Sequence, residues 1–335
     1  MSSFAIGDLA RGLQLRSDQA RIQSDLLRLS NELSTGQKSK IGTAVAGDFG
    51  PLVGLDADLR RLDGYDTTVT EAALLTSAAQ AGLERVQTSA IDLASNLILV
   101  QNSTNPNTVD ALGAEAKQAF EAMISALNQT VGDKTIFAGV ATDAPALAQA
   151  DVILGALSTA VSAETTAADV EAIVEAWFAP GGDFETIAYL GATDARAPIR
   201  LNDDADVVFG ASANDTELRE VLKSVATAAL LEEGVLLGAP EERAELAGNS
   251  GQAILTAETG LIDLRSRIGR AEESIDVAKA QNQARRSALD IARSEIVTAD
   301  QFTTAAELEA TQFQLEALYT VTARLSQLTL TKFLR

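Results

Sequence analysis

The 335-residue sequence contains no cysteine and no histidine. Without cysteine, the chain can form neither disulfides nor thiolate metal sites, and it has no thiol nucleophile. Without histidine, it lacks the commonest general base and the commonest ligand of transition metals. We therefore expect a protein that is not an enzyme and that uses no cofactor and no metal.

Aromatic residues, basic residues and long apolar runs are also scarce. Aromatics make up 4% of a chain that is 46% hydrophobic, which favours long alanine-rich helices over a compact enzyme core. No run of about 18 apolar residues occurs, so we expect no membrane insertion. Lys and Arg number 26 against 47 Asp and Glu, for a net charge of −21. That charge repels nucleic acid and anionic membrane surfaces, and we expect neither as a partner.

No stretch carries a recognisable catalytic or ligand-binding motif. The glycines at 47, 50 and 54 lack the spacing of a dinucleotide loop, and no phosphate loop with a following Lys-Ser or Lys-Thr occurs. Asp203, Asp204 and Asp206 lie close together, but the loop glycine and the terminal glutamate of a calcium-binding loop are missing. We interpret this cluster as a solvated acidic turn.

The last 36 residues, 300–335, have no Gly or Pro and carry a heptad repeat of apolar residues. Leu308, Leu315 and Thr322 lie in one column, and Thr311, Leu318 and Leu325 lie in the other. The alternating steps of three and four place both columns on one face of a helix, as in a coiled coil. A second apolar line of residues is expected to widen that face: Phe302, Phe313, Tyr319, Leu328, Leu330 and Phe333.

The first 34 residues show the same pattern. Leu15, Ile22 and Leu29 recur every seven residues, and Leu26 and Leu33 fall in the interleaved column. Two explanations are open at this point. The two terminal helices either close a helical bundle within one chain, or they form an assembly device that repeats from subunit to subunit.

Between the termini, the chain is expected to form long helices that are interrupted once. Heptad columns predict a helix from Leu55 to about residue 104, a second over 108–130 and a third over 241–298. Glycines and a short apolar core at Ile136-Phe137 predict a small hairpin over 131–146. Residues 37–51 are expected to form an extended connection.

Residues 140–240 form an acidic island, with 17 carboxylates against four basic side chains. Helices are expected over 151–161, 166–178 and 215–233, and strands over 185–190, 198–201 and 207–209. We interpret residues 146–238 as an inserted, solvated α+β domain with its own core at Trp177-Phe178. No heptad column runs through it, so it is expected to be dispensable for the packing of the long helices.

The predicted fold class is therefore mainly α: a long coiled-coil helical rod made by the N- and C-terminal segments, with a small β-hairpin and an inserted α+β domain. The expected divisions are an N-terminal assembly helix (1–36), long helices and hairpin (37–145), the acidic outer domain (146–238), a returning long helix (239–298) and a C-terminal assembly helix (299–335).

Three stretches resemble the flagellin family of bacterial axial proteins. Residues 26–36, LLRLSNELSTG, are similar to the family's N-terminal LxxLSxxLSTG element. Residues 325–335, LSQLTLTKFLR, are similar to its C-terminal ending, LSxLSLxxYL. Residues 132–145, which contain Ile136-Phe137-Ala138-Gly139, are similar to a hairpin of the hook-associated branch that joins hook to filament. A filament flagellin shares the two terminal elements, so the hairpin favours the junction protein.

The resemblance implies a structural subunit of the flagellum that is secreted unfolded, without a cleaved signal, and is located outside the cell. It implies that the partners are the neighbouring junction protein, filament flagellin, copies of the chain itself, the flagellar export apparatus and an export chaperone on the C-terminal helix. The alternatives are flagellin itself and a cytoplasmic coiled-coil adaptor. The residues expected to pack between subunits are Leu15, Ile22, Leu26, Leu29, Leu33, Leu308, Leu315, Leu318, Leu325, Leu328, Leu330 and Phe333.

Overall fold

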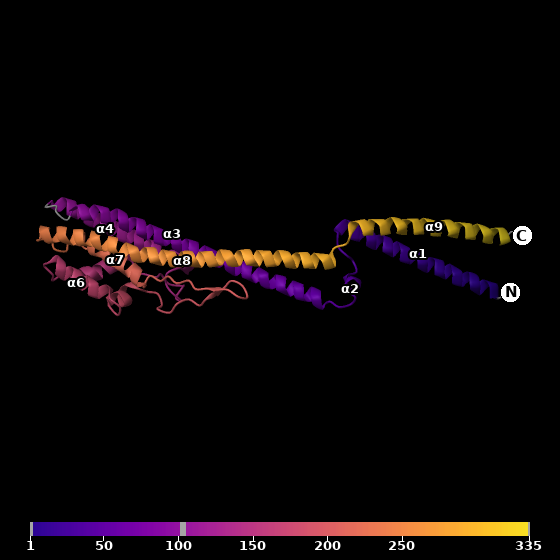
Figure 1. The fold of residues 1–335 in the computed structure, drawn as a ribbon, viewed down its shortest axis with the longest axis horizontal. Helices are drawn as coiled ribbons and strands as arrows, with labels where there is room; N and C mark the ends of the chain where they lie inside the picture. Colours follow the sequence, from indigo (N-terminus) through magenta and orange to yellow (C-terminus); the bar gives the residue numbers. More distant parts are fainter. Residues whose placement is uncertain (1–2, 101–104, 334–335) are drawn as a thin grey trace. The chain divides into compact units, whose positions relative to one another are not determined.

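The computed structural model describes residues 3–100 and 105–333. The chain divides into two compact units, one made by the residues up to Arg61 with those from Ala284 onward, and the other by Leu62–Gln283. The structure is 73% helical, which confirms the mainly α fold class. The helices are α1 (Ser3–Thr35), α2 (Ile41–Ala44), α3 (Gly50–Val100), α4 (Pro106–Leu127), α5 (Ala150–Ala160), α6 (Ala167–Phe178), η1 (Phe184–Ala188), α7 (Thr216–Ala229), α8 (Pro240–Val297) and α9 (Gln301–Phe333) (Figure 1). In the described part of the chain, no helix is both long enough and apolar enough to cross a bilayer.

Most positions of the predicted heptad columns of the long helices are buried, whereas Leu55, Tyr65, Leu289 and Ile296 are half-buried. On α3, one column consists of Leu62, Val69, Thr76, Leu83, Ala90 and Leu97, and the other of Ala72, Ala79, Val86, Leu93 and Val100. On α8, the buried column is Ile254, Leu261, Ile268 and Ile275. Each column returns to the same helical face because two turns take about seven residues.

The connection at 37–51 differs from the expectation of an extended segment. It contains the single helical turn α2, and α3 begins at Gly50, five residues before the predicted start. The start of α3 is favoured by Asp48, whose Oδ1 accepts a hydrogen bond of 2.9 Å from the Gly50 amide. A short acceptor just before a helix satisfies one of its free amides.

The predicted hairpin is present as β1 (Thr130–Val131) and β2 (Lys134–Thr135), paired antiparallel with Val131 opposite Lys134. Gly132 and Asp133 at the turn both have positive φ, 55° and 63°, as a two-residue turn of the primed type requires. The following Ile136 and Phe137 are fully buried.

An arginine from the acidic island holds this region in place. Arg196 Nε donates to the Gly139 carbonyl at 3.0 Å, and one Nη donates to the carbonyls of Thr135 and Ile136. The guanidinium also lies over the Phe209 ring, 5.5 Å from its centroid. Because burial withdraws the cation from water, it lowers the pKa of Arg196.

One strand prediction in the island is wrong. Residues 185–190 form the π-helical turn η1 and one isolated bridge, Leu147 to Tyr189. The cause is packing, because Phe184 stacks on Phe178 with ring centroids 5.1 Å apart and meets Trp177 edge-on at 6.1 Å. The other two predicted strands are present but shorter, as β3 (Ile199–Arg200) and β4 (Asp206–Val207).

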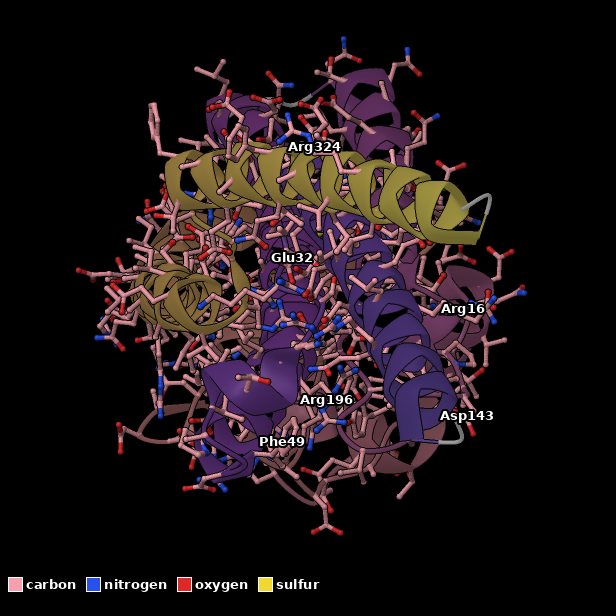
Figure 2. The ribbon with its side chains drawn as sticks, turned by 90° about the vertical axis from the view of Figure 1, so that its right-hand side faces the viewer. Arg16, Glu32, Phe49, Asp143, Arg196 and Arg324 are labelled. Carbon is pink, nitrogen blue, oxygen red and sulfur yellow. The ribbon has the colours of Figure 1, made fainter. Side chains whose placement is uncertain are left out.

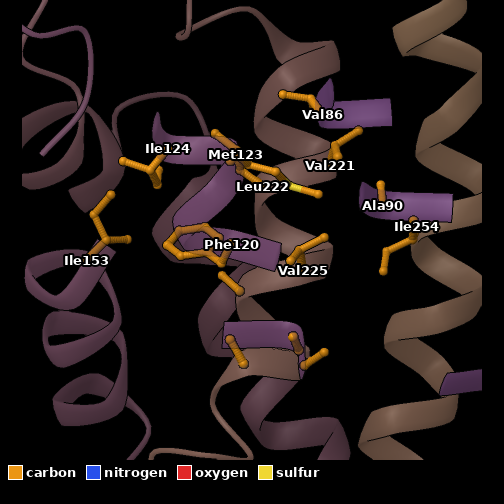
Figure 3. Packing of buried hydrophobic residues seen from close by; sticks show 14 of the residues in the cluster. Val86, Ala90, Phe120, Met123, Ile124, Ile153, Val221, Leu222, Val225 and Ile254 are labelled. Atoms are coloured by element: carbon orange, nitrogen blue, oxygen red, sulfur yellow. The ribbon is translucent and has the colours of Figure 1, made fainter. Parts of the chain in front are cut away.

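The acidic island shares one hydrophobic core with the long helices. The core brings together Phe120 of α4, Ile153 of α5, Val225 of α7 and Ile254 of α8 (Figure 3). Trp177 and Phe178 belong to the same cluster, so they do not enclose a core of their own. Deleting the island would therefore uncover apolar side chains of α4 and α8, and we do not expect the rest of the unit to tolerate the loss.

Candidate assembly interface

The terminal helices α1 and α9 pack side by side (Figure 1). The end of α1 and the beginning of α9 lie together, because the Ala299 amide donates to the Gly36 carbonyl at 2.9 Å. In chain direction, α1 runs toward this joint and α9 runs away from it. The two helices therefore form an antiparallel pair. The exposed Arg16 and Arg324 mark α1 and α9 in Figure 2.

Both helices have defined ends at the joint. α1 stops at Gly36, which has φ 69° and donates its amide to the Glu32 carbonyl at 2.9 Å, as is common for a helix-terminating glycine. α9 begins after Asp300, whose Oδ1 accepts from the Thr303 and Phe302 amides at 3.2 and 2.9 Å. These bonds lower the pKa of Asp300 because they favour its charged form.

A short antiparallel bridge closes the joint. Gln37 pairs with Thr298, and the Lys38 amide donates to the Val297 carbonyl at 2.8 Å. The Lys38 ammonium donates to the Ile296 carbonyl at 3.0 Å. The end of α1 is thus attached by main-chain bonds to the residues between α8 and α9.

Glu32 is a buried acid at this joint, and sequence reasoning did not select it (Figure 2). One carboxylate oxygen accepts from Arg28 at 2.9 Å, and the other accepts from the Ser39 amide at 2.9 Å. The spacing of four between Arg28 and Glu32 is visible in the sequence, but the bond to Ser39 depends on how the chain turns after Gly36. Burying this carboxylate is tolerable because both of its oxygens are paired.

The predicted packing residues of α1 are buried or half-buried, and so are three of the seven predicted on α9. Ile22 and Leu29 are buried, and Leu15, Leu26 and Leu33 are half-buried. On α9, Leu308, Leu315 and Leu318 are half-buried, whereas Leu325 is exposed. Leu328, Leu330 and Phe333 lie in the last turns of α9, and their side chains fall outside the described residues.

Two glutamines of α1 set the register of this contact. The side-chain amides of Gln19 and Gln23 both donate to the Tyr319 hydroxyl at 3.4 Å. We call the face along which α1 and α9 contact each other the seam. Ile22 lies between the two glutamines on α1, and Leu318 precedes Tyr319 on α9, so Ile22 and Leu318 stand at the same level along the seam. The sequence contained no signal for this pairing, since about 300 residues separate the partners.

Other apolar residues of the pair point away from the seam. Phe302 and Phe313 are 91% and 73% exposed. Eleven residues are about three turns plus 20°, so the two rings share a face, and that face is opposite to Leu308 and Leu315. The expectation that these phenylalanines widen the seam is therefore wrong, because they form a second face. On α1, Leu13 and Leu27 are 61% and 69% exposed and lie two heptads apart.

The acidic turn has partners within the protein. The Tyr65 hydroxyl donates to Asp203 at 2.9 Å, and an Arg200 Nη donates to the Asp203 carbonyl at 3.0 Å. The Asn202 side chain accepts from the Asp204 amide. Within residues 3–100 and 105–333, no group of three Asp, Glu, His or Cys side chains is placed to hold a metal ion.

Comparison with known proteins reveals a shared fold. No family model and no curated protein matches the sequence. Among solved structures, a protein assigned as a flagellar hook-associated protein of Vibrio parahaemolyticus is similar with a TM-score of 0.54 and 14% identity, over 73% of this chain and 95% of that one. Bacillus cereus FlgL is similar with a TM-score of 0.51 and 13% identity, over 72% of this chain and 100% of that one. At such identities the likeness establishes the fold.

Proposed function

We propose that the chain is a structural subunit of the bacterial flagellum, and that it is the junction protein that joins the hook to the filament. The observation that carries this proposal is the fold, which matches a flagellar hook-associated protein over 95% of that protein's length. The hairpin at 130–135 and the terminal sequence elements point in the same direction. In this role the protein has no catalytic activity and is located outside the cell.

Assembly occurs through α1 and α9. Each of these helices covers only one face of the other, and exposed apolar side chains such as Leu27 and Phe313 remain on their outer faces. Helices gain most of their stability in water by burying an apolar face, so a pair with two uncovered faces is suited to contact with further subunits. We assign to this contact the seam residues and the outward phenylalanines Phe302 and Phe313.

The partners are the neighbouring axial proteins of the flagellum, namely another junction protein and filament flagellin, together with copies of the chain itself. Before assembly, the chain passes the flagellar export apparatus unfolded, with an export chaperone on α9. A chaperone on α9 would cover the apolar surface that the helix exposes before assembly.

Deletion of the gene in a flagellated host, combined with labelling of the protein, tests the proposal. For a junction protein, deletion leaves hooks without filaments, filament protein appears in the medium, and an antibody against this chain labels the base of the filament. Label along the whole filament would instead identify flagellin. Retention of the protein inside the cell, with and without active flagellar export, would identify a cytoplasmic adaptor and refute the proposal.

A further inference from the structure

Residues 197–208 leave the main hydrophobic core and return to it at one place, and we call this segment the flap. Before the flap, Arg196 is fixed by the bond from its Nε to the Gly139 carbonyl at 3.0 Å. After the flap, Phe209 is buried in the main core. The Arg196 guanidinium lies 5.5 Å from the centroid of the Phe209 ring, so the two ends of the flap adjoin. A surface loop with adjoining ends is a compact unit that is held at its base.

The inner side of the flap covers a small apolar cluster that is separate from the main core. Leu201 and Val207 of the flap are buried in this cluster. The helices α3 and α8 supply the remaining buried side chains: Val69, Ala72, Ile275 and Ala278. The buried side chains of α5, α6 and α7 belong to the main core instead. Opening the flap would therefore uncover α3 and α8 at this level without disturbing the main core.

A buried amide of α8 holds the flap in its closed position. Asn282 lies seven residues after Ile275 in the apolar column of α8 and is 2% exposed. Its side-chain nitrogen donates to the Leu201 carbonyl at 2.9 Å. The next residue of the flap, Asn202, donates from its own side-chain amide to the Gln281 side chain at 3.1 Å. A buried polar group is costly unless its hydrogen bonds are made, so Asn282 favours one position of the flap.

The pairing of α3 with α8 does not depend on the flap. Nε of Arg265 on α8 donates to the Gln80 side chain of α3 at 3.2 Å, and Gln80 donates in return to the Arg265 carbonyl at 2.8 Å. Three residues further along each helix, Leu83 and Ile268 are buried in the main core. The flap itself contains only β3 and β4, of two residues each, and a hairpin of that size is not stable alone in water. The two helices are thus the scaffold on which the flap folds.

We propose that the flap opens and closes over α3 and α8 as a unit of its own, while the main core stays folded. In the closed state it covers Val69 and Ile275. In the open state these apolar side chains reach water, and Asn282 and the Leu201 carbonyl exchange their mutual hydrogen bond for bonds to water. Opening breaks few contacts in comparison with global unfolding, so it requires less free energy and occurs more often. The flap lies outside the terminal helices, and its opening does not depend on the proposed role in the flagellum.

Hydrogen exchange of the full-length protein, followed by mass spectrometry, tests the proposal. Peptides over 199–207 report on the flap, where the Leu201 amide donates to the Ala205 carbonyl at 2.9 Å, and peptides over 216–229 report on the main core through α7. In the wild-type protein the flap should exchange at least about tenfold faster than α7. Ile254→Val weakens the main core about 30 Å along α8 from Ile275, and it should speed the exchange of α7 about fivefold while leaving the flap unchanged.

Asn282→Ala should speed the exchange of the flap about tenfold, because the Leu201 carbonyl loses its donor. The control Lys279→Ala changes an exposed side chain of α8 about one turn before Asn282, and its flap should exchange as in the wild-type protein. Equal acceleration of the flap and of α7 in Ile254→Val would mean that the flap opens only when the whole unit unfolds, and it would overturn the proposal. Flap exchange that is as slow as that of α7 in the wild-type protein, or that Asn282→Ala leaves unchanged, would overturn it as well.

Discussion

Replacing Leu318 by aspartate should prevent assembly while leaving the folding of the isolated protein nearly unchanged. Leu318 lies half-buried on α9, at the level of Ile22 on α1. In the isolated protein the new carboxylate keeps contact with water, so the loss is limited to part of one leucine's burial, about 1–2 kcal/mol. That loss falls on the α1–α9 pair. The core of Leu62–Gln283 contains none of these residues, and its unfolding should not change.

In the assembly that we propose, the same position is expected to be surrounded by apolar neighbours. An unpaired carboxylate there costs about 3 kcal/mol or more, which is a factor of at least about one hundred in the affinity between subunits. Cells that carry Leu318→Asp should therefore secrete the protein normally but shed filament subunits into the medium. Electron microscopy of the cells and blotting of the medium provide the measurement.

The matched control is Glu316→Gln, because Glu316 is exposed on α9 two residues before Leu318. It should leave filaments attached. Attached filaments in the Leu318→Asp strain would show that this face of α9 is not an assembly contact, and the assignment of the seam would be wrong. Failure of both variants to be secreted would place the role of this segment in export instead.

Four further predictions concern the terminal helices and the packing of the core. Limited proteolysis of the purified monomer should remove roughly residues 1–40 and 295–335 first, because a helix that buries one face alone is marginal in water; resistance of these ends would contradict this. Phe313→Ser should leave monomer stability unchanged, since the ring is 73% exposed, but should reduce filament attachment; normal attachment would show that the outward face is unused. Arg243→Met should lower the free energy of unfolding by about 2–4 kcal/mol in denaturant titrations, because it removes the buried guanidinium that donates to the Leu231 and Val235 carbonyls. Asp110→Asn, at a half-exposed partner of the same guanidinium, should cost less than about 1 kcal/mol. Gly113→Ala should lower the free energy of unfolding by about 1–2 kcal/mol in the same titrations, because its Cβ would lie 2.9 Å from the Glu232 amide nitrogen. Gly155→Ala has open space around it and should raise the free energy of unfolding by up to about 1 kcal/mol; equal effects at both sites would refute the packing argument.

Several features could be read from the sequence because local geometry decides them. The columns through Leu83 on α3 and Ile268 on α8 are buried as their spacing predicts, since the pitch of a helix brings residues seven apart to the same face. Gly36 ends α1, and the turn at Gly132 forms the hairpin, because glycine adopts positive φ without steric cost. Each of these outcomes depends on residues within one or two turns of one another.

Other features required the tertiary structure. An apolar face on α7 or α4 is evident from the sequence, but the choice of partner is not, and the acidic island joins the main core instead of forming a second one. The run at 185–190 becomes a π-helical turn because Phe184 packs against Trp177 and Phe178. The buried acid Glu32 depends on the amide of Ser39, and Arg196 depends on carbonyls about 60 residues away. Periodicity is a property of the helix itself, whereas the pairing of faces and the partners of buried charges arise only when distant segments meet.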